Sequence, residues 1–221
     1  MIITIDGPAG SGKSTIARLL AAKLEIEYID SGALYRTLTW FGSRHFEALE
    51  GNQSEIARLF GARKDELKIT FAHHQQQILF GGEDISGAIR DRSLTKKIRY
   101  IANHPACRDL INQMIRDIAE RYAVVVDGRD IGTVVFPESK NKFYLDASST
   151  IRATRRATED GTATVGPGFD ALVAEITSRD QSDMNREIAP LKVPDDATTI
   201  ATDLLSVEEV LQALQSKLNL D

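Results

Sequence analysis

The sequence is poor in cysteine and in long apolar runs, and it has no excess of positive charge. Its 221 residues include one cysteine, Cys107, so no disulfide can form within the chain, which is typical of a reducing compartment. No apolar run approaches the roughly 18 residues that a membrane span needs. The N-terminus lacks a basic stretch leading into an apolar one, so no signal peptide is predicted. We therefore expect a cytoplasmic protein without a membrane partner.

The charge balance argues against a general nucleic-acid binder. Lysine and arginine total 27 against 32 acidic residues, giving a formal net charge of −5, whereas such binders carry a basic excess. Any positively charged site must then be a local cluster of arginines. Hydrophobic residues make up 42% and charged residues 27%, which is close to globular averages and excludes extended disorder.

Short apolar strands alternate with helical stretches along most of the chain. Because the strands lack polar alternation and are separated by helices, they predict an α/β fold with a central parallel sheet covered on both faces. The predicted strands are 2–5, 26–29, 124–126, 143–145 and 197–201. The predicted helices carry apolar stripes within 16–24, 34–41, 107–118 and 207–218, with Pro105 in the first turn of the third and a Ser206/Glu209 capping box on the last.

One segment breaks this alternation. The runs 67–71 and 76–80 have the pattern of a β-hairpin, followed by a third short strand near Ile85. These strands are too close together for helical crossovers, so we expect an insertion outside the main sheet. His73 and His74 fall at the hairpin tip, where we expect them to be exposed to solvent.

The strongest motif follows the first strand directly. Residues 7–14 read GPAGSGKS and satisfy G-x-x-x-x-G-K-[ST] between a strand and a helix, the context that a phosphate-binding loop needs. Its backbone N–H groups and the helix N-terminus would hold nucleotide phosphates, with Lys13 at the β- and γ-phosphates and the Ser14 hydroxyl on Mg²⁺. The residues assigned to ATP are Gly7, Pro8, Ala9, Gly10, Ser11, Gly12, Lys13, Ser14 and Thr15.

The remaining sequence narrows the class of nucleotide protein. A switch GTPase needs N-K-x-D, but Asn141-Lys142 is followed at the fourth position by Tyr144. Asp127 ends a buried strand, where it is placed to act as a Walker-B acid beside Mg²⁺. The four histidines show no metal-ligand spacing.

Two arginine clusters flank a glycine-rich loop at 161–168. Arg152, Arg155 and Arg156 have the spacing of one helical face, and they either form a clamp over phosphates or a solvated face paired with Glu159. Arg179, Asp183 and Arg186 share a face of the next helix and would form a charged triad, in which Asp183 binds a sugar hydroxyl or orients the arginines. The loop between the clusters has the character of a mobile lid.

Charged residues also follow two of the predicted strands. Asp127-Gly128-Arg129-Asp130 and Asp30-Ser31 with Arg36 lie where strands end, the edge at which ligands bind in parallel α/β sheets. Each group alone is equally well explained as a helix cap or a surface ion pair. Together they indicate a second site for an anionic ligand next to the phosphate-binding loop.

At these motifs the sequence resembles the bacterial-type cytidylate kinases, within the nucleoside monophosphate kinases. The resemblance runs nearly end to end and is most specific in DSGALYR and DGRDIGTVVFP. The matching segments are 3–15, 29–36, 81–90, 126–137, 143–148 and 179–191. It implies Mg²⁺-dependent transfer of the ATP γ-phosphoryl group to CMP or dCMP, a lid, and a monophosphate-binding region enlarged by a small β-rich insertion.

The resemblance also implies roles for individual residues. Arg36 and Arg129 are similar to ligands of the acceptor phosphate, and Ser31, Arg108 and Asp130 to base-contacting positions. Arg179 and Asp183 resemble the pair that holds ribose and phosphate, with Arg186 as a further substrate contact. Lys13, Arg152, Arg155, Arg156 and Arg186 would act on the transferring phosphoryl group.

Two positions depart from the family pattern. Arg99 stands where the family usually has a base-contacting serine, which bears on selectivity against UMP. Ile200-Ala201-Thr202-Asp203 replaces the usual run near the C-terminus, so contacts on the adenine side are expected to differ. A kinase of another small acceptor and an ATP-binding regulatory module without turnover are the alternatives.

The expected organisation is a single domain over 1–221 that acts as a monomer on small nucleotides. Its core comprises 1–30, 104–148 and 187–221. Residues 31–103 form the monophosphate-binding region, with the insertion at about 64–90, and 149–186 form the lid region.

Overall fold

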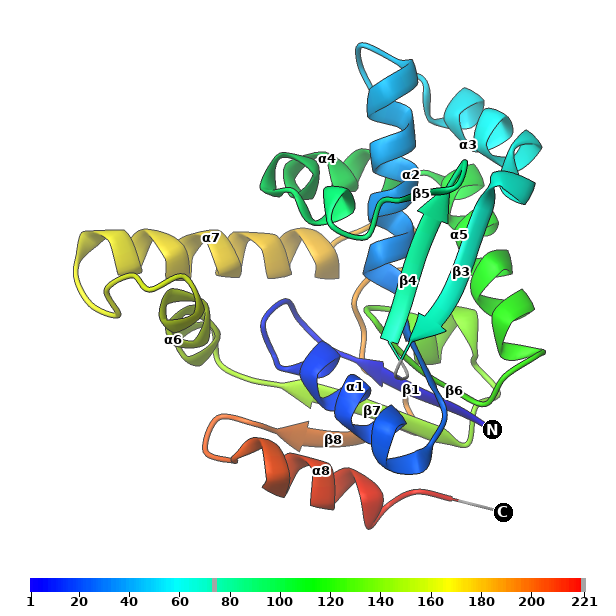
Figure 1. Ribbon diagram of the computed structural model, residues 1–221. Helices are drawn as coiled ribbons and strands as arrows, with labels where there is room; N and C mark the ends of the chain where they lie inside the picture. Colours follow the sequence, from blue (N-terminus) through cyan, green and yellow to red (C-terminus); the bar gives the residue numbers. More distant parts are fainter. Residues whose placement is uncertain (73–74, 220–221) are drawn as a thin grey trace. The chain divides into compact units, whose positions relative to one another are not determined.

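A computed structural model describes residues 1–72 and 75–219 of the chain (Figure 1). The chain forms two compact units, one of Met1–Leu20 with Val125–Asp221 and one of Ala21–Val124. The predicted position of His73 and His74 lies outside the described residues. Each unit is described by itself below.

The first unit is built on strands in the order β6-β1-β7-β8. β1, β7 and β8 run parallel, with Ile5 opposite Phe143 and Leu145 opposite Ile200. Figure 1 shows α8 alongside β8. The elements are β1 (Ile2–Asp6), α1 (Lys13–Leu24, whose last turn belongs to the second unit), β6 (Val124–Gly128), the π-helical turn η3 (Ile131–Val135), β7 (Asn141–Asp146), α6 (Ser149–Glu159), α7 (Pro167–Met184), β8 (Thr198–Ala201) and α8 (Val207–Gln215).

The centre of this sheet is mostly apolar. Ile3 and Ile5 of β1 are fully buried, as are Val125 of β6 and Leu145 of β7. The carboxylates of these strands, Asp6, Asp127 and Asp146, lie at or next to the ends of the strands. The predicted parallel α/β sheet is confirmed.

The second unit combines helices with a small antiparallel sheet. In the hairpin β3–β4, Ile69 lies opposite Ile78, and β5 pairs with the other edge of β4. Phe41, Phe60 and Phe80 form an aromatic cluster with ring centroids 5.1–5.6 Å apart. The elements are β2 (Glu27–Asp30), α2 (Ser31–His45), α3 (Gln53–Ala62), η1 (Lys64–Glu66), β3 (Leu67–Ala72), β4 (Gln75–Phe80), β5 (Glu83–Asp84), η2 (Ala88–Arg90), α4 (Arg92–Ala102) and α5 (Pro105–Ala119).

Local sequence signals account for the helix ends. Pro105 occupies the first turn of α5, where its missing N–H is not needed. Ser206 and Glu209 form the predicted capping box of α8, and Ser148 caps α6 by accepting the N–H of Ile151. Asp30 caps α2, which is one of the two explanations open for that residue.

The third strand of the insertion, predicted near Ile85, is present as Glu83–Asp84. Two helix ends differ from the predictions. α7 ends at Met184, so Arg186 lies beyond the helix on which it was predicted. α8 ends at Gln215, three residues before Leu218. The apolar or charged spacing in the sequence extends past both helix ends, whereas the helices themselves end at Met184 and Gln215. Within the described residues, no helix is long and apolar enough to cross a membrane.

Candidate active site

The phosphate-binding loop leaves β1 through a turn that only glycine fits. Gly7 has φ +148°, and a Cβ there would lie 2.1 Å from the carbonyl oxygen of Leu145. β7 therefore approaches the loop too closely for any side chain at this position. The loop ends at Lys13, the first residue of α1, so the helix N-terminus faces the loop with its unpaired N–H groups.

Lys13 is held inside the loop and is only 4% exposed. Its Nζ donates to the carbonyl of Pro8 at 2.6 Å and lies 3.5 Å from Ser11 Oγ. Burial, with a smaller effect from the nearby Arg129 charge, lowers the pKa of Lys13 to about 7, although Asp127 and Asp6 oppose the shift. The ammonium group therefore lacks sufficient negative charge around it, which an anionic ligand would supply.

Ser14 and Asp127 meet at the loop, although 113 residues separate them. The Ser14 hydroxyl donates to the Asp127 carboxylate at 2.8 Å. A hydroxyl and a carboxylate are hard oxygen donors, and they fit the few protein ligands that Mg²⁺ uses beside phosphates. Among the described residues, no group of three or more His, Cys, Asp or Glu side chains is placed to hold a metal by itself.

A second charged group surrounds Asp183 of α7. This carboxylate accepts Arg129 Nε at 3.1 Å through one oxygen and the Arg186 guanidinium through the other. Asp183 is 5% exposed, so it holds both arginines from a buried position. Arg179 is close enough to lower the pKa of Lys13 as well. Of the predicted site residues, the structure thus brings Lys13, Arg129, Arg179, Asp183 and Arg186 into one neighbourhood of the first unit.

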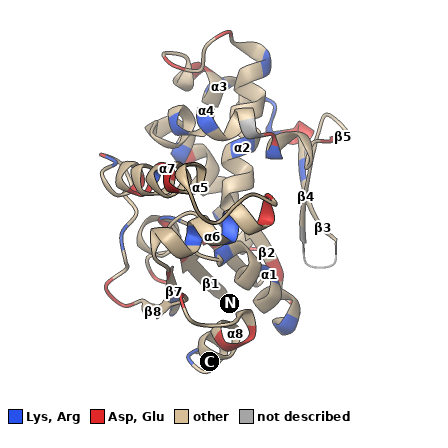
Figure 2. Cartoon of the chain, turned by 90° about the vertical axis from the view of Figure 1, so that its left-hand side faces the viewer, with Lys and Arg blue, Asp and Glu red and all other residues tan. Residues whose placement is uncertain are grey.

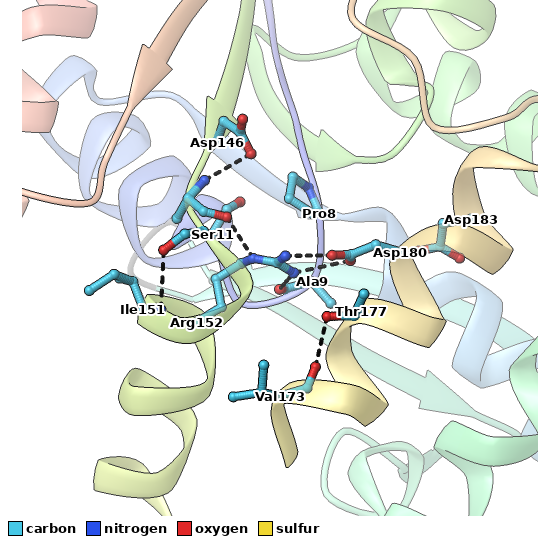
Figure 3. A network of polar contacts seen from close by, with 12 residues as sticks. Pro8, Ala9, Ser11, Asp146, Ile151, Arg152, Val173, Thr177, Asp180 and Asp183 are labelled. Carbon is cyan, nitrogen blue, oxygen red and sulfur yellow. Dashed lines mark hydrogen bonds and ion pairs between the residues drawn. The ribbon is translucent and has the colours of Figure 1, made fainter. Parts of the chain in front are cut away.

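Arg152 has a different environment from the other arginines of α6. It is 4% exposed, and its guanidinium lies between Ala9 of the loop and Asp180 of α7 (Figure 3). Nε donates to the carbonyl of Ala147 at 2.8 Å, and a terminal nitrogen lies 3.0 Å from both the carbonyl oxygen of Ala9 and Asp180 Oδ1. The other terminal nitrogen pairs with Asp180 Oδ2. Arg152 therefore connects α6, α7 and the loop.

Arg155 and Arg156 also lie on α6, whose basic segments are visible in Figure 2, but they have partners different from those of Arg152. Arg155 donates to the hydroxyl and the carbonyl of Thr202, at 3.1 and 2.6 Å. Arg156 pairs with Asp160, and not with the Glu159 expected for a solvated face. The residue four positions on lies one helical turn away, which favours Asp160. The three arginines do not share one partner in this structure.

In the second unit, Asp30 organises the residues around it. Its carboxylate accepts the N–H of Ala33 and Arg36, each at 2.8 Å, and lies 3.8 Å from Arg90. Its own N–H donates to the side chain of Gln76 from the β-insertion. Arg36 is thus held beside the start of α2, next to the buried Ser31.

The two other predicted residues of the second unit differ in exposure. Arg108 is 3% exposed, donates to the carbonyl of Ala102 and lies over the Tyr35 ring. Arg99 is exposed and donates to the Tyr100 hydroxyl at 3.0 Å. In the structure, Arg99 has the character of a surface residue on α4.

Sequence reasoning did not single out Asp6, Asp180 and Thr202 of the first unit or Gln76 of the second unit. Asp6 and Asp180 had a signal, because Asp6 ends an apolar strand and Asp180 lies beside Arg179 in a charged run. Thr202 lies in the segment that departs from the family pattern, and its hydroxyl lies 3.1 Å from the carbonyl oxygen of Asp146 and 3.4 Å from that of Ser11. Gln76 had no signal, since its partner is 46 residues away.

An open cavity of about 640 Å³ lies elsewhere in the first unit. It is lined by residues that begin strands, among them Ile2 and Asn141. The phosphate-binding loop follows the opposite end of β1. Because ligands of parallel α/β sheets bind at the carboxyl ends of the strands, we assign this cavity no part in the site.

The parallel sheet leads into a glycine loop that holds a lysine, and a Ser–Asp pair and an array of arginines accompany that loop. These features define the class of P-loop kinases. Within that class, the family model described as cytidylate kinase matches residues 3–219. The chain belongs to the cytidylate kinase family.

Individual proteins agree with this assignment. The cytidylate kinase of Geobacillus sp. (strain WCH70) is 38% identical over 98% of this chain and 96% of its own. The cytidylate kinase of Mannheimia succiniciproducens is 39% identical over 97% of this chain and 94% of its own. An uncharacterized protein from Eubacterium ventriosum, at 12% identity and a TM-score of 0.53 over 98% of this chain and 96% of its own, shares the fold.

Proposed function

We propose that the protein is a cytidylate kinase that transfers the γ-phosphoryl group of ATP to CMP or dCMP, forming ADP and CDP or dCDP. The observation that carries the proposal is the Lys13 loop and the arginines around Asp183 in one neighbourhood of the first unit. Two polyanions must be brought together for phosphoryl transfer, and this neighbourhood concentrates positive charge in a chain whose net charge is −5.

On the donor side, the chain's own groups bind and orient the triphosphate. The N–H groups of the loop and the start of α1 bind phosphate oxygens, and Lys13 adds a buried positive charge. Ser14 and Asp127 would hold Mg²⁺, which supplies charge neutralisation at the β- and γ-phosphates when it is bound. Thr202 and Arg155, next to the loop, are proposed to border the adenine side.

On the acceptor side, the first unit offers paired guanidinium groups. Asp183 holds Arg129 and Arg186 side by side, and guanidinium groups are well suited to bind a phosphate. We assign Arg129 to the acceptor phosphate, Arg179 and Asp183 to ribose and phosphate, and Asp130 to the base. The acceptor phosphate oxygen is itself the nucleophile, so no general base is required and catalysis is alignment and charge stabilisation.

In the second unit, considered by itself, Arg36 is proposed as a phosphate ligand and Ser31 and Arg108 as contacts of cytosine. Asp30 supports this assignment, because it holds Arg36 at 2.8 Å. An arginine and a hydroxyl supply the donors that cytosine N3 and O2 accept.

The role of Arg152, Arg155 and Arg156 in stabilising the transferring group remains a prediction. It requires Arg155 to leave Thr202 and Arg152 to leave Asp180. The second change costs more, since Arg152 and Asp180 are both buried. Lid motion between α6 and α7 is likewise a prediction.

Acceptor profiling tests the proposal. Purified protein with ATP and Mg²⁺ is assayed for ADP formation with CMP, dCMP, UMP, AMP or no acceptor. We expect turnover with CMP or dCMP and little without an acceptor. Equal ADP formation without a monophosphate, or a clear preference for another acceptor, would contradict it. Arg99 is exposed, and the family resemblance implies a base-contacting serine at this position, so the CMP-to-UMP ratio is the most informative comparison.

A further inference from the structure

Asp6 is the last residue of β1 and directly precedes the phosphate-binding loop. Its side chain is fully buried. One carboxylate oxygen accepts the N–H of Ile131 at 2.9 Å and the other accepts the N–H of Gly132 at 2.7 Å. These partners lie 125 and 126 residues further along the chain.

The two N–H groups belong to the start of η3. The first N–H groups of a helical turn have no acceptor within the turn and need one from elsewhere. Asp6 supplies this acceptor from the end of β1, and its negative charge also suits the N-terminus of the turn. The residues immediately before the turn are Arg129 and Asp130, so the position of η3 determines where these two side chains lie relative to the loop.

Space around the contact is closely filled. A Cβ on Gly132 would lie 3.2 Å from the Asp6 carboxylate, 3.0 Å from Thr4 Oγ1 and 3.1 Å from a side-chain carbon of Pro194. The turn therefore approaches β1 closely because residue 132 has no side chain. A side chain there would push η3 away from Asp6.

We propose that Asp6 is a positioning residue for the acceptor nucleotide, because it ties the start of the phosphate-binding loop to the turn that carries Arg129 and Asp130. The proposal rests on the proposed function, from which the roles of Arg129 and Asp130 come. It assigns Asp6 no contact with either nucleotide. Through this tie, the donor and acceptor phosphates keep a fixed separation.

The charge state of Asp6 gives the proposal a pH signature. The groups that face it are Lys13, Asp130 and the phenol of Tyr144. Burial raises the pKa of Asp6 from 3.8 to about 7, against the opposing effect of the two backbone hydrogen bonds. The carboxylate accepts both N–H groups, whereas a protonated carboxyl loses one acceptor. The tie is therefore weaker below the pKa, and acceptor binding should improve as the pH rises through it.

The stability of the protein depends on the charge state of Asp6 in the opposite direction with pH. The folded-state pKa lies above the unfolded value, so the contribution of Asp6 to stability is fully present below the unfolded pKa and decreases as pH rises through the folded pKa. Asp6→Asn removes the titrating group, and with it the effect of Asp6 on the pH dependence of both acceptor binding and stability. In wild type, a rise in pH should therefore improve acceptor binding and lower stability through Asp6, and the variant should show neither effect. A residue with a purely structural role is not expected to produce these opposite pH effects.

The experiment compares full-length wild type, Asp6→Asn and the surface control Asp117→Asn. CMP and ATP are each varied in steady-state assays between pH 6 and 8, and stability is followed by urea unfolding. We expect Asp6→Asn to lower kcat/KM for CMP by about 10- to 100-fold, the effect of a misplacement of about 1 Å, with KM for ATP changed less than twofold. Asp117 is exposed on α5, and its variant should match wild type.

Each outcome decides the proposal. Unchanged CMP kinetics in Asp6→Asn, or equal losses for CMP and ATP, would overturn it. If that variant does not fold, Gly132→Ala takes its place, with the same acceptor-specific loss expected and unchanged CMP kinetics overturning the proposal. Wild type without CMP turnover refutes the proposed function instead, so the two failures are distinguishable.

Discussion

Lys13 and Asp6 are two buried ionisable residues whose pKa values are brought to about 7 from opposite sides. Burial disfavours the charged form of each, so the lysine value falls and the aspartate value rises. Each charge partly compensates the other. Such perturbed groups are concentrated at functional sites, and here they flank the same glycine loop.

Replacing Lys13 with alanine removes the buried charge from the donor site. We expect Lys13→Ala to lower kcat by about 100- to 1000-fold, since one electrostatic contact to the developing charge is lost. An enzyme-coupled assay of ADP formation, with CMP as the acceptor, checks this. Lys23→Ala, in the last turn of the same helix, serves as control and should leave kcat near the wild-type value.

Replacing Arg129 should affect the acceptor and not the donor. Arg129→Ala removes one guanidinium from the Asp183 array, and we expect KM for CMP to rise by about tenfold or more, as for the loss of a charge-assisted hydrogen bond. KM for ATP should change little. Separate titrations of CMP and ATP measure both, and unchanged CMP kinetics would show that the assignment of Arg129 is wrong.

Cys107 gives a prediction about reactivity. Burial raises the pKa of this thiol to about 12, so almost none of it is thiolate at pH 8. We expect no alkylation by iodoacetamide in the native protein and complete alkylation after unfolding in urea. Mass spectrometry of the two samples decides the matter, and rapid labelling of the native protein would contradict the buried position.

At the scale of elements, α6 and α7 are joined to each other and to the loop by one buried ion pair. The Arg152 guanidinium contacts Asp180 on α7 and the carbonyl of Ala9 in the loop. Neither side chain is accessible to solvent to any extent that would screen the charges. The two helices of the predicted lid are therefore linked through the same residue that contacts the phosphate-binding loop.

Removing one partner of this pair leaves a buried charge without compensation. We expect Asp180→Asn to lower the free energy of unfolding by about 3–5 kcal/mol. The matched control is Asp160→Asn, which breaks the more exposed Arg156 pair on α6 and should cost less than about 1 kcal/mol. Urea unfolding of both variants tests this, and equal losses would show that the Arg152 pair contributes no more than a surface pair.

At the scale of the whole molecule, nucleotide binding is linked to unfolding. A ligand at 100 times its Kd raises the free energy of unfolding by about 2.7 kcal/mol. We expect ATP with Mg²⁺ to raise the Tm of wild type but much less that of Lys13→Ala, while CMP raises the Tm of both. Thermal unfolding with each nucleotide measures the shifts. Loss of the CMP effect in Lys13→Ala would mean that the two nucleotides do not use separate groups.

The extent of sequence prediction differs between parts of the molecule. The strands, the α5 and α8 helix starts and the β-hairpin follow from local apolar spacing, proline and capping residues, and all are present. α3 was not predicted, because its buried residues Ile56, Ala57 and Phe60 make a short stripe within only ten residues. The pairing of Arg156 with Asp160 in place of Glu159 was also missed, since both acids lie within reach in sequence and side-chain geometry selects one.

The amino-acid sequence by itself determined the glycine loop motif, the helix caps and the parallel α/β class, because each can be recognised from short motifs and from the order of apolar strands and helices along the chain. Tertiary structure alone decided that Asp6 binds the turn at Ile131 and that Arg152 pairs with Asp180. These partners are 125 and 28 residues apart in the chain. Which charged groups meet inside the protein depends on which strand and helix ends become neighbours. The packing of these elements therefore decides the partner of each buried charge.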